Sequence, residues 1–289
     1  MDDPGVAARY AAATAAREPA GLHELRHPDY VARWPQSGEL VRGRERMAEL
    51  ERADASGASH VDGVRRLEGQ DDLWTLESVV TNAAGSRWWW VSILELRDGR
   101  VARETAYRCE AFEAPAWRAP HVERFDGTTP PAALGPRPEG SAAAAVRLGE
   151  AYGAAAKAQD YDRLGTLRAA GWTCEWPQSG ERIRGHAADV AIHSAYPGYP
   201  NLQLTRVATS PEGWELSPLL IPIRVHGAGP MAVGEGVNDY PQGERWFVVQ
   251  LLELDGGRVT RETGYFGRAV EPPAWRAALV ERFDPLAAS

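Results

Sequence analysis

The sequence predicts an α+β fold that is written twice in one chain, each copy having helices on one face of a curved antiparallel sheet. Three observations lead to this prediction. Long segments recur with high identity, each copy opens with helix-like segments, and each copy closes with strand-like segments joined by tight turns. We therefore expect two tandem domains with the same cone-shaped architecture.

The repeat is clearest in two motifs. WPQSGE occurs at residues 34–39 and again at 176–181, which is 142 residues later. The segment 99–126 aligns without a gap to 257–284, which is 158 residues later, and 19 of the 28 positions are identical. The difference between the two offsets places 16 extra residues in the middle of the second copy.

The domain boundaries follow from the repeat and from composition. Residues 127–141 contain four prolines and three glycines, which is typical of a semi-stiff linker. We expect a first domain at 1–126 and a second at 142–289, each long enough to bury its own core.

Helices are expected first in each copy. Residues 5–17 and 142–158 are alanine-rich, with larger apolar residues near helical spacing. Further helices are expected at 22–25, 44–53, 164–167 and 186–195.

Strands follow the helices, and the turns at Asp98-Gly99 and Gly256-Gly257 predict hairpins. The expected strands are 30–36, 61–68, 73–81, 87–97 and 100–108 in the first copy, and 172–178, 202–209, 214–225, 245–255 and 258–266 in the second. The glycine-rich part of 218–244 is expected to be either a lid loop or an extended hairpin.

Both faces of the strand 87–97 are mostly apolar, so we expect the sheet to be covered on both sides. The helices of the same copy provide one cover. The other cover is either the second copy, packed sheet to sheet as an intramolecular pseudo-dimer, or another chain in a homodimer.

Composition excludes several classes of function. The net charge is -8 and there is no lysine- or arginine-rich run, which argues against nucleic acid and membrane as partners. Two cysteines and no recognisable signal peptide favour the cytoplasm. The seven histidines have no metal-ligand spacing, and no phosphate or dinucleotide motif is present, so we expect neither metal nor cofactor.

The motifs WPQSGE-x-x-RG and Tyr-x-x-x-x-x-Glu-x-Pro-Ala-Trp-Arg, together with the order of elements, resemble the SnoaL-like branch of the nuclear transport factor 2 superfamily. The resemblance covers both copies. It implies a cystatin-like cone around an apolar pocket, and it leaves the reaction open, because relatives include ring cyclases, isomerases, dehydratases, epoxide hydrolases and binding domains.

A carboxylate among apolar neighbours is the expected acid or base, because burial raises its pKa toward neutrality. Glu77 lies in the apolar stretch LWTLESVV of the first copy. A gap-free alignment that starts from Trp74 and Trp214 places Ser217 at the matching position, so this acid is expected in the first copy alone.

Four further catalytic candidates recur in both copies. Glu95 and Glu253 occupy matching places on the third long strand, while Tyr107 and Tyr265 are candidate donors to an oxyanion. Each has a plain alternative, exposure near the hairpin for the glutamates and packing for the tyrosines. Glu104 and Glu262 also recur, on the face opposite these tyrosines.

The candidate substrate-binding residues are aromatic or amide side chains near the expected pocket mouth. They are Trp34, Gln36, Trp74, Trp90, Trp176, Gln178, Tyr196, Trp214 and His226. The alternative for the WPQSGE residues, including Glu39 and Glu181, is that they shape the turn into the following helix.

The sequence therefore predicts an enzyme that needs no cofactor and that uses pocket acid or base groups on an apolar, polyketide-like metabolite. Cyclisation, isomerisation, dehydration and epoxide opening all fit. The alternative is a protein that binds a hydrophobic ligand without turnover, for example for self-resistance.

Overall fold

The computed structural model describes residues 5–54, 60–82, 84–132, 141–195, 220–239 and 244–287. It divides the chain into two compact units. Unit 1 comprises residues 1–111 together with the C-terminal segment 269–289, and unit 2 comprises residues 112–268.

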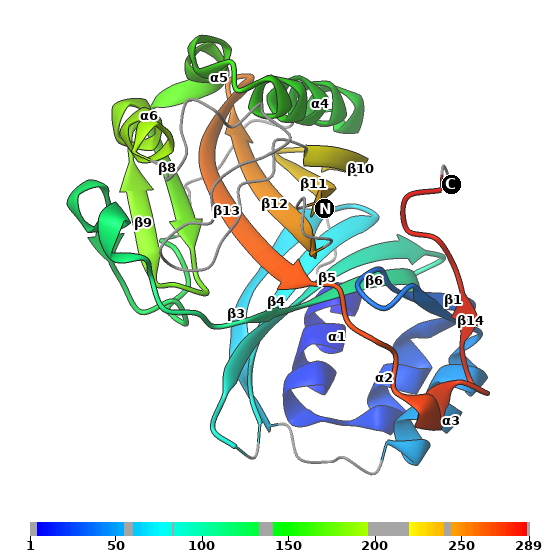
Figure 1. Ribbon diagram of the computed structural model, residues 1–289. Coiled ribbons are helices and arrows are strands. Elements are labelled where there is room, and N and C mark those ends of the chain that lie inside the picture. Colours follow the sequence, from blue (N-terminus) through cyan, green and yellow to red (C-terminus); the bar gives the residue numbers. More distant parts are fainter. Residues whose placement is uncertain are drawn as a thin grey trace. The chain divides into compact units, whose positions relative to one another are not determined.

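Unit 1 contains three α-helices and a seven-stranded sheet in its described residues (Figure 1). The helices are α1 (Gly5–Ala16), α2 (Pro19–Leu25) and α3 (Arg44–Ala53). The strands are β1 (Arg26–Trp34), β2 (Glu39–Arg42), β3 (His60–Gln70), β4 (Leu73–Thr81), β5 (Arg87–Arg97), β6 (Arg100–Glu110) and β14 (Glu281–Arg282), and a short 3-10 helix η3 (Ala274–Arg276) precedes β14.

Unit 2 repeats this order. Its helices are α4 (Ala142–Ala158), α5 (Tyr161–Leu167) and α6 (His186–Ser194). Its strands are β7 (Glu123–Arg124), β8 (Arg168–Trp176), β9 (Glu181–Arg184), β10 (Leu220–Ala228), β11 (Met231–Asp239), β12 (Arg245–Asp255) and β13 (Arg258–Arg268), and the 3-10 helix η1 (Ala116–His121) precedes β7.

The two sheets have the same strand order. In unit 1 it is β14-β2-β1-β6-β5-β4-β3, and in unit 2 it is β7-β9-β8-β13-β12-β11-β10. Strands β3 to β6 and β10 to β13 form antiparallel meanders, whereas β1 pairs with β6, and β8 with β13, in parallel. The expected α+β fold is confirmed.

Local sequence explains where several elements begin and end. The side chains of Ser141 and Asp160 cap α4 and α5 by accepting the backbone N–H groups of Ala144 and Arg163. Pro19 occupies the first turn of α2, where its missing N–H is not needed. Asp98 and Gly99 both have positive φ in the tight β5–β6 turn, as the sequence indicated.

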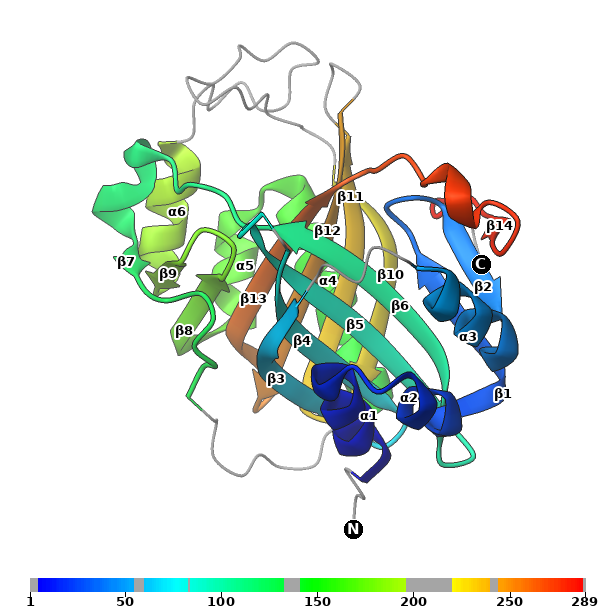
Figure 2. The same ribbon diagram turned by 90° about the horizontal axis from the view of Figure 1, so that it is seen from below.

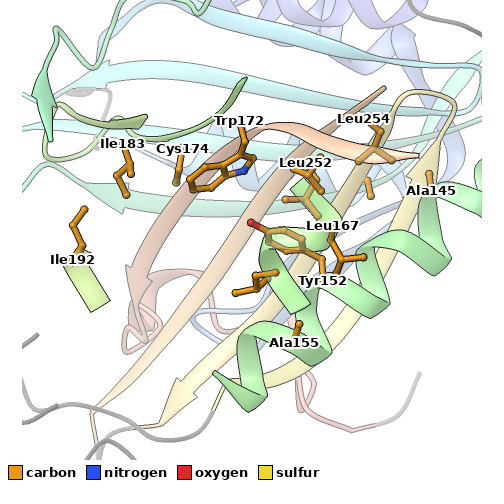
Figure 3. Packing of buried hydrophobic residues seen from close by; sticks show 13 residues of the cluster. Ala145, Tyr152, Ala155, Leu167, Trp172, Cys174, Ile183, Ile192, Leu252 and Leu254 are labelled. Atoms are coloured by element: carbon orange, nitrogen blue, oxygen red, sulfur yellow. The ribbon is translucent and has the colours of Figure 1, made fainter. Parts of the chain in front are cut away.

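The helices cover one face of each sheet. In unit 1, α1 lies across β3 and β4 (Figure 2), and Tyr10 packs with Leu76 and Leu94 from the sheet. In unit 2, α4 lies against β10 and β11, and Tyr152 points its hydroxyl toward the side of Trp172 (Figure 3). We call the face of each sheet that packs against these helices its helix-facing side.

The opposite face of β5 is also buried, as the apolar pattern predicted. Val91 and Ile93, which alternate with the helix-facing Leu94, have relative exposures of 0% and 1%. Because successive side chains on a strand point to opposite faces, alternate residues of β5 lie on two different buried faces. Only residues on the same face can act together in one site.

The closing segment of each copy belongs to the compact unit of the other copy. Strand β7, from the first copy, pairs with β9 in unit 2, and β14, from the second copy, pairs with β2 in unit 1. The repeats 1–126 and 142–289 therefore differ from the compact units by an exchange of tails. This exchange could not be predicted from the sequence, because both copies carry similar tails and the same WPQSGE turn.

In the middle of the second copy the structure selects the extended hairpin over the lid loop. Residues 231–239 form the regular strand β11, which pairs antiparallel with β10 and β12. The matching pairs Glu77–Val91 and Glu235–Val249 show that the structural partner of Glu77 is Glu235, not Ser217. The offset is still 142 in α6 and already 158 in β10, so the extra residues lie between Ser194 and Leu220.

The expected strand at 202–209 lies outside the described residues, as does the first part of the one expected at 214–225. In the described ranges, no helix has both the length and the apolar composition that crossing a bilayer requires.

A matched pair of substitutions on α4 tests how closely this helix packs on its sheet. A Cβ added at Gly149 would lie 2.7 Å from Cγ1 of Val225, whereas one added at Gly153 meets nothing within 4 Å. We expect Gly149→Ala to lower the free energy of unfolding by about 1–3 kcal/mol through overpacking. Gly153→Ala should raise it by roughly 0.5–1 kcal/mol, because alanine favours the helix. Urea unfolding followed by circular dichroism measures both, and equal effects would contradict the close approach.

Candidate functional site

Each sheet carries one glutamate at the same position on its helix-facing side. Glu104 of β6 lies opposite Ala32 of β1, and Glu262 of β13 lies opposite Cys174 of β8. Ala32 and Cys174 belong to the helix-side cores, so the two carboxylates face the helices as well. A carboxylate in this place is costly unless it is hydrogen-bonded, which directs attention to its partners.

In unit 1, three hydroxyl groups surround the carboxylate of Glu104. Tyr10 and Tyr30 donate to Oε2 at 2.6 Å each, and Ser92 donates to Oε1 at 2.6 Å. Tyr10 comes from α1, Tyr30 from β1 and Ser92 from β5, so three separate elements converge on one group. Three O–H donors compensate this carboxylate for the water that it loses on folding.

An arginine completes the unit 1 cluster. Arg26 Nε donates to the Tyr10 hydroxyl at 3.4 Å, and Arg26 Nη2 donates to Glu51 of α3 at 2.7 Å. The guanidinium also stands over the Tyr30 ring, 5.0 Å from its centroid. The cluster thus compensates two carboxylates with one cation and three hydroxyls.

Unit 2 keeps the tyrosine and the arginine around Glu262. Tyr152 donates to Oε2 at 2.6 Å, Gln250 donates to Oε1 at 3.0 Å, and Arg168 Nε donates to the Tyr152 hydroxyl at 2.8 Å. Gln250 stands where unit 1 has Ser92, one amide in place of a hydroxyl.

The carboxylate that pairs with the arginine lies one helical turn earlier in unit 2 than in unit 1. Arg168 Nη1 donates to Asp189 of α6 at 2.6 Å, and His193 lies 3.3 Å from the same carboxylate. By the 142-residue offset, His193 occupies the place of Glu51. Trp172 replaces Tyr30, and the Arg168 guanidinium stands 3.7 Å from its ring.

Burial shifts the pKa values of both clusters. Burial raises the pKa of Glu262 above its usual range, although Arg168 and the Tyr152 hydrogen bond act in the opposite direction. Burial, reinforced by the adjacent glutamate, also raises the pKa of Tyr10 and Tyr152. The tyrosines are therefore donors and not bases, whereas Glu262 is a carboxyl group that exchanges a proton closer to neutral pH.

The same face of unit 1 carries an exposed aromatic and two buried donors. Trp90 is 37% exposed. Ser78 Oγ and Trp88 Nε1 are buried and have no hydrogen-bond partner among the described residues. The β4–β5 register places Ser78 and Trp88 as diagonal neighbours, so both donors serve one side of the sheet. At the matching position in unit 2, Trp246 Nε1 donates a hydrogen bond to the Glu244 carboxylate at 3.3 Å.

Glu77 lies on the opposite face from Glu104. It is fully buried and pairs with Arg65 at 2.6 Å and with Arg66. Its counterpart Glu235 pairs with His226 Nε2 at 2.6 Å. A carboxylate held by two guanidinium groups is stabilised as the anion, which makes it a poor base.

The other catalytic candidates also lie away from the helices. Tyr107 and Tyr265 are 1% and 0% exposed on the face opposite Glu104 and Glu262, as the strand period predicted. The two remaining candidates are ion-paired. Glu95 is half-buried with Arg103 at 3.1 Å, and Glu253 is buried with Arg261 at 3.4 Å.

Gln36 and Gln178 bond to backbone. Gln36 Nε2 donates to the carbonyl of Arg108 at 2.9 Å, and its Oε1 accepts the N–H of the same residue at 2.6 Å. Gln178 makes the matching pair with Phe266 at 2.7 and 2.6 Å. Both amides thereby extend the ladder of the neighbouring strand.

Glu39 and Glu181 receive the tail arginines. Arg276 Nε donates to Glu39 at 3.0 Å, and Arg118 Nη2 lies 3.0 Å from Glu181. Both glutamates have zero exposure. The same arginines stand over the rings of Trp34 and Trp176 at 4.8 and 5.0 Å, so the half-buried tryptophans contact the tails.

Three candidate binding residues remain. Trp74 is buried in the helix-side core and donates to the carbonyl of Asp71 at 3.0 Å. Tyr196 and Trp214 lie outside the described residues. Within the described ranges, no three histidine, cysteine, aspartate or glutamate side chains gather as a metal ion would require.

Glu104 and Glu262 recur in the sequence but were not among the predicted catalytic residues, and their partners were not predicted at all. A signal was present, because Tyr10 and Arg26 recur as Tyr152 and Arg168 at the 142-residue offset. Polar identity at helix and strand positions that are otherwise apolar marks a preserved buried cluster.

The family described as "SnoaL-like domain" matches residues 7–104. An "NTF-2 like protein of unknown function" from Burkholderia xenovorans is 31% identical, over 42% of this chain and 92% of that chain, with a TM-score of 0.38. A "putative ketosteroid isomerase" from Kribbella flavida is 28% identical, over 49% of this chain and 90% of that chain, with a TM-score of 0.38. No curated protein matches the chain.

A "putative polyketide cyclase" from Sinorhizobium meliloti is 20% identical, over 36% of this chain and 94% of that chain, with a TM-score of 0.32. Each of these three matches covers less than half of this chain.

Replacing Glu262 tests the raised pKa. The native state keeps this proton at pH values where the unfolded chain has lost it, so the stabilisation is complete below the ordinary pKa of 4.5. It is lost as the pH rises through the raised native value. Relative to wild type, Glu262→Gln should therefore gain stability as the pH rises above about 4.5.

Thermal unfolding across this range measures the difference. Tyr152→Phe provides the companion variant, because removing a hydrogen bond that lowers the Glu262 pKa should enlarge the pH dependence. Parallel pH profiles for wild type and Glu262→Gln would contradict the assignment.

Proposed function

Because the chain belongs to the SnoaL-like family of the nuclear transport factor 2-like superfamily, we propose that it is a cofactor-independent enzyme that moves protons on an apolar small molecule. The observation that carries this proposal is a carboxyl group at the same helix-facing position in both units, Glu104 and Glu262. In each unit it accepts a hydrogen bond from a tyrosine of the first helix. An apolar residue there would be cheaper to bury, so retention of the acid favours a chemical role.

The proposed chemistry uses Glu104 or Glu262 as the acid–base group. The carboxylate takes a proton from a carbon next to a carbonyl, and the resulting carboxylic acid returns it to another atom of the same molecule. This one exchange serves isomerisation, ring closure or loss of water. Relatives described as an isomerase and a cyclase make these reaction classes the first to test.

In unit 1, Ser78 and Trp88 are the proposed donors to an oxygen at the end of the substrate away from Glu104. Their O–H and N–H groups are buried without partners among the described residues, and they share a sheet face with Glu104, four and six strand positions along from the residue opposite it. Donors at that distance orient a polar group of the substrate while Glu104 acts on another part of it. Trp90 supplies an apolar surface beside them.

Deuterium exchange tests proton transfer without knowledge of the product. A panel of apolar ketones of increasing size is incubated with the protein in heavy water, and mass spectrometry follows exchange of the hydrogens next to the carbonyl. We expect exchange above buffer for ketones that fit. Replacing both acids, Glu104→Gln with Glu262→Gln, should slow it by roughly 100-fold or more.

Glu95→Gln is the control, because Glu95 lies on the other face of the sheet and pairs with Arg103. Exchange that is equally fast in the double variant, or absent for every ketone, would remove the enzyme proposal.

A second candidate function is ligand binding without turnover, and the half-exposed Trp90 beside two unpartnered donors is the observation that favours it. Quenching of tryptophan fluorescence measures the affinity for the same ketones. We expect Trp90→Ala to weaken binding by roughly tenfold. Ser78→Ala should weaken binding of a ketone more than that of the hydrocarbon of the same shape, because only the ketone accepts a hydrogen bond.

Trp275→Ala is the control, since Trp275 is similarly exposed at 46% but lies in the C-terminal segment. Ketone binding that survives in Glu104→Gln with Glu262→Gln, together with no exchange in wild type, selects this second function. Equal losses for the ketone and the hydrocarbon would contradict the role of Ser78.

A further inference from the structure

The C-terminal tail of each copy packs in the compact unit of the other copy, and the proposed catalytic role does not explain this exchange. We define the first tail as residues 112–126 and the second tail as residues 269–284. The receptor is the WPQSGE turn with the edge strand that follows it, residues 34–42 in unit 1 and 176–184 in unit 2. In each unit the receptor comes from one copy and the tail from the other (Figures 1 and 2).

The backbone contacts of the two tails are the same. The second tail donates from Val270 and Phe283 to the carbonyls of Gln36 and Gly38, both at 2.9 Å. The first tail donates from Phe112 and Phe125 to the carbonyls of Gln178 and Gly180 at 3.1 and 3.0 Å. Each tail then adds a two-residue strand to the receptor edge, which is a standard way for a sheet to capture a peptide.

The charged contacts are duplicated as well. Besides the buried pairs of Arg276 and Arg118, Arg42 donates to Glu281 at 3.0 Å and Arg184 donates to Glu123 at 2.6 Å. Both pairs are exposed and contribute little energy, but they fix the register of each tail along its receptor.

The fit depends on a glycine in each receptor. A Cβ added at Gly38 would lie 2.9 Å from the carbonyl oxygen of Phe283, and one added at Gly180 would lie 2.6 Å from that of Phe125. Gly43 and Gly185 have positive φ as well, yet an added Cβ there meets nothing within 4 Å. Alanine at any of the four positions strains the backbone, but only alanine at Gly38 or Gly180 also collides with the tail, so comparing the two pairs isolates the tail contact.

We propose that the receptor is a docking site for the tail of a separate copy of this repeat, so that two copies that are not joined hold together by reciprocal tail exchange. The contacts duplicate closely, so each receptor accepts a tail of this sequence whichever chain supplies it. The exchange is reciprocal, because each copy supplies one tail and one receptor. The linker 127–141 joins a pair that is complete without it. This inference is independent of the proposed catalytic role.

Cleaving the linker in the folded full-length chain tests the proposal. A protease recognition sequence placed within residues 133–140 yields two halves, each with one receptor and one tail. Size-exclusion chromatography with light scattering, over a dilution series, then measures whether the halves stay together. We expect the cleaved wild-type halves to remain a pair at the lowest measurable concentration.

Two matched variants locate the interaction. Gly38→Ala with Gly180→Ala should weaken the pair by roughly 100-fold or more, whereas Gly43→Ala with Gly185→Ala should leave it unchanged. Arg118→Ala with Arg276→Ala changes only the tails and should also separate the halves, which covers failure of the glycine variant to fold before cleavage.

Halves that separate at once in wild type, or that dissociate equally in both glycine variants, would overturn the proposal. So would halves that stay together in the arginine variant to the same dilution as wild type.

Discussion

The ion pair between a buried glutamate and the arginine of an exchanged tail is the interaction on which each unit depends. Glu39 and Glu181 have no exposure, and a carboxylate buried in this way destabilises the fold unless a cation meets it. Arg276 and Arg118 meet that need from the other copy. Neither copy therefore completes its own compact unit, and removal of one partner leaves an uncompensated charge, at a cost of roughly 3–5 kcal/mol.

This dependence explains where the two copies remained alike. The WPQSGE turn and the AWR tail motif are two sides of one contact, and each must fit the partner supplied by the other copy. A change in one receptor alone would leave a mismatched tail. Trp176 of the receptor also packs closely on β13, because its Cδ1 would lie 3.1 Å from a Cβ added at Gly264. Gly264 is two residues after Glu262 on this strand. The tail contact and the carboxylate face are thus neighbours on one sheet.

The sequence predicts the fold well because its signals are local. Turns such as Asp98-Gly99 and the alternation along β5 locate most strands directly. The exchange of tails could not be predicted, since the two receptors share the WPQSGE turn and the two tails are similar, so the sequence shows no preference of either receptor for either tail. Glu77 was aligned with Ser217 and not with Glu235, because the gap-free alignment started from Trp214, at an offset smaller than the one found in the strands. The Glu104 and Glu262 clusters were incompletely predicted, because their partners Tyr10, Arg26, Tyr152 and Arg168 come from elements far apart in sequence and meet only in three dimensions.

The clusters also show what was free to change. The glutamate, the helix tyrosine and the arginine are the same in both units, whereas Ser92 is replaced by Gln250, Tyr30 by Trp172, and the arginine's partner Glu51 by Asp189. Glu104 accepts hydrogen bonds from three hydroxyl groups, whereas Glu262 accepts one from Tyr152 and one from Gln250. Burial raises the pKa of Glu262, which is 7% exposed. Two copies of one scaffold therefore hold the same acid among different hydrogen-bond donors, which is a physical basis for one chain to offer two chemically distinct sites.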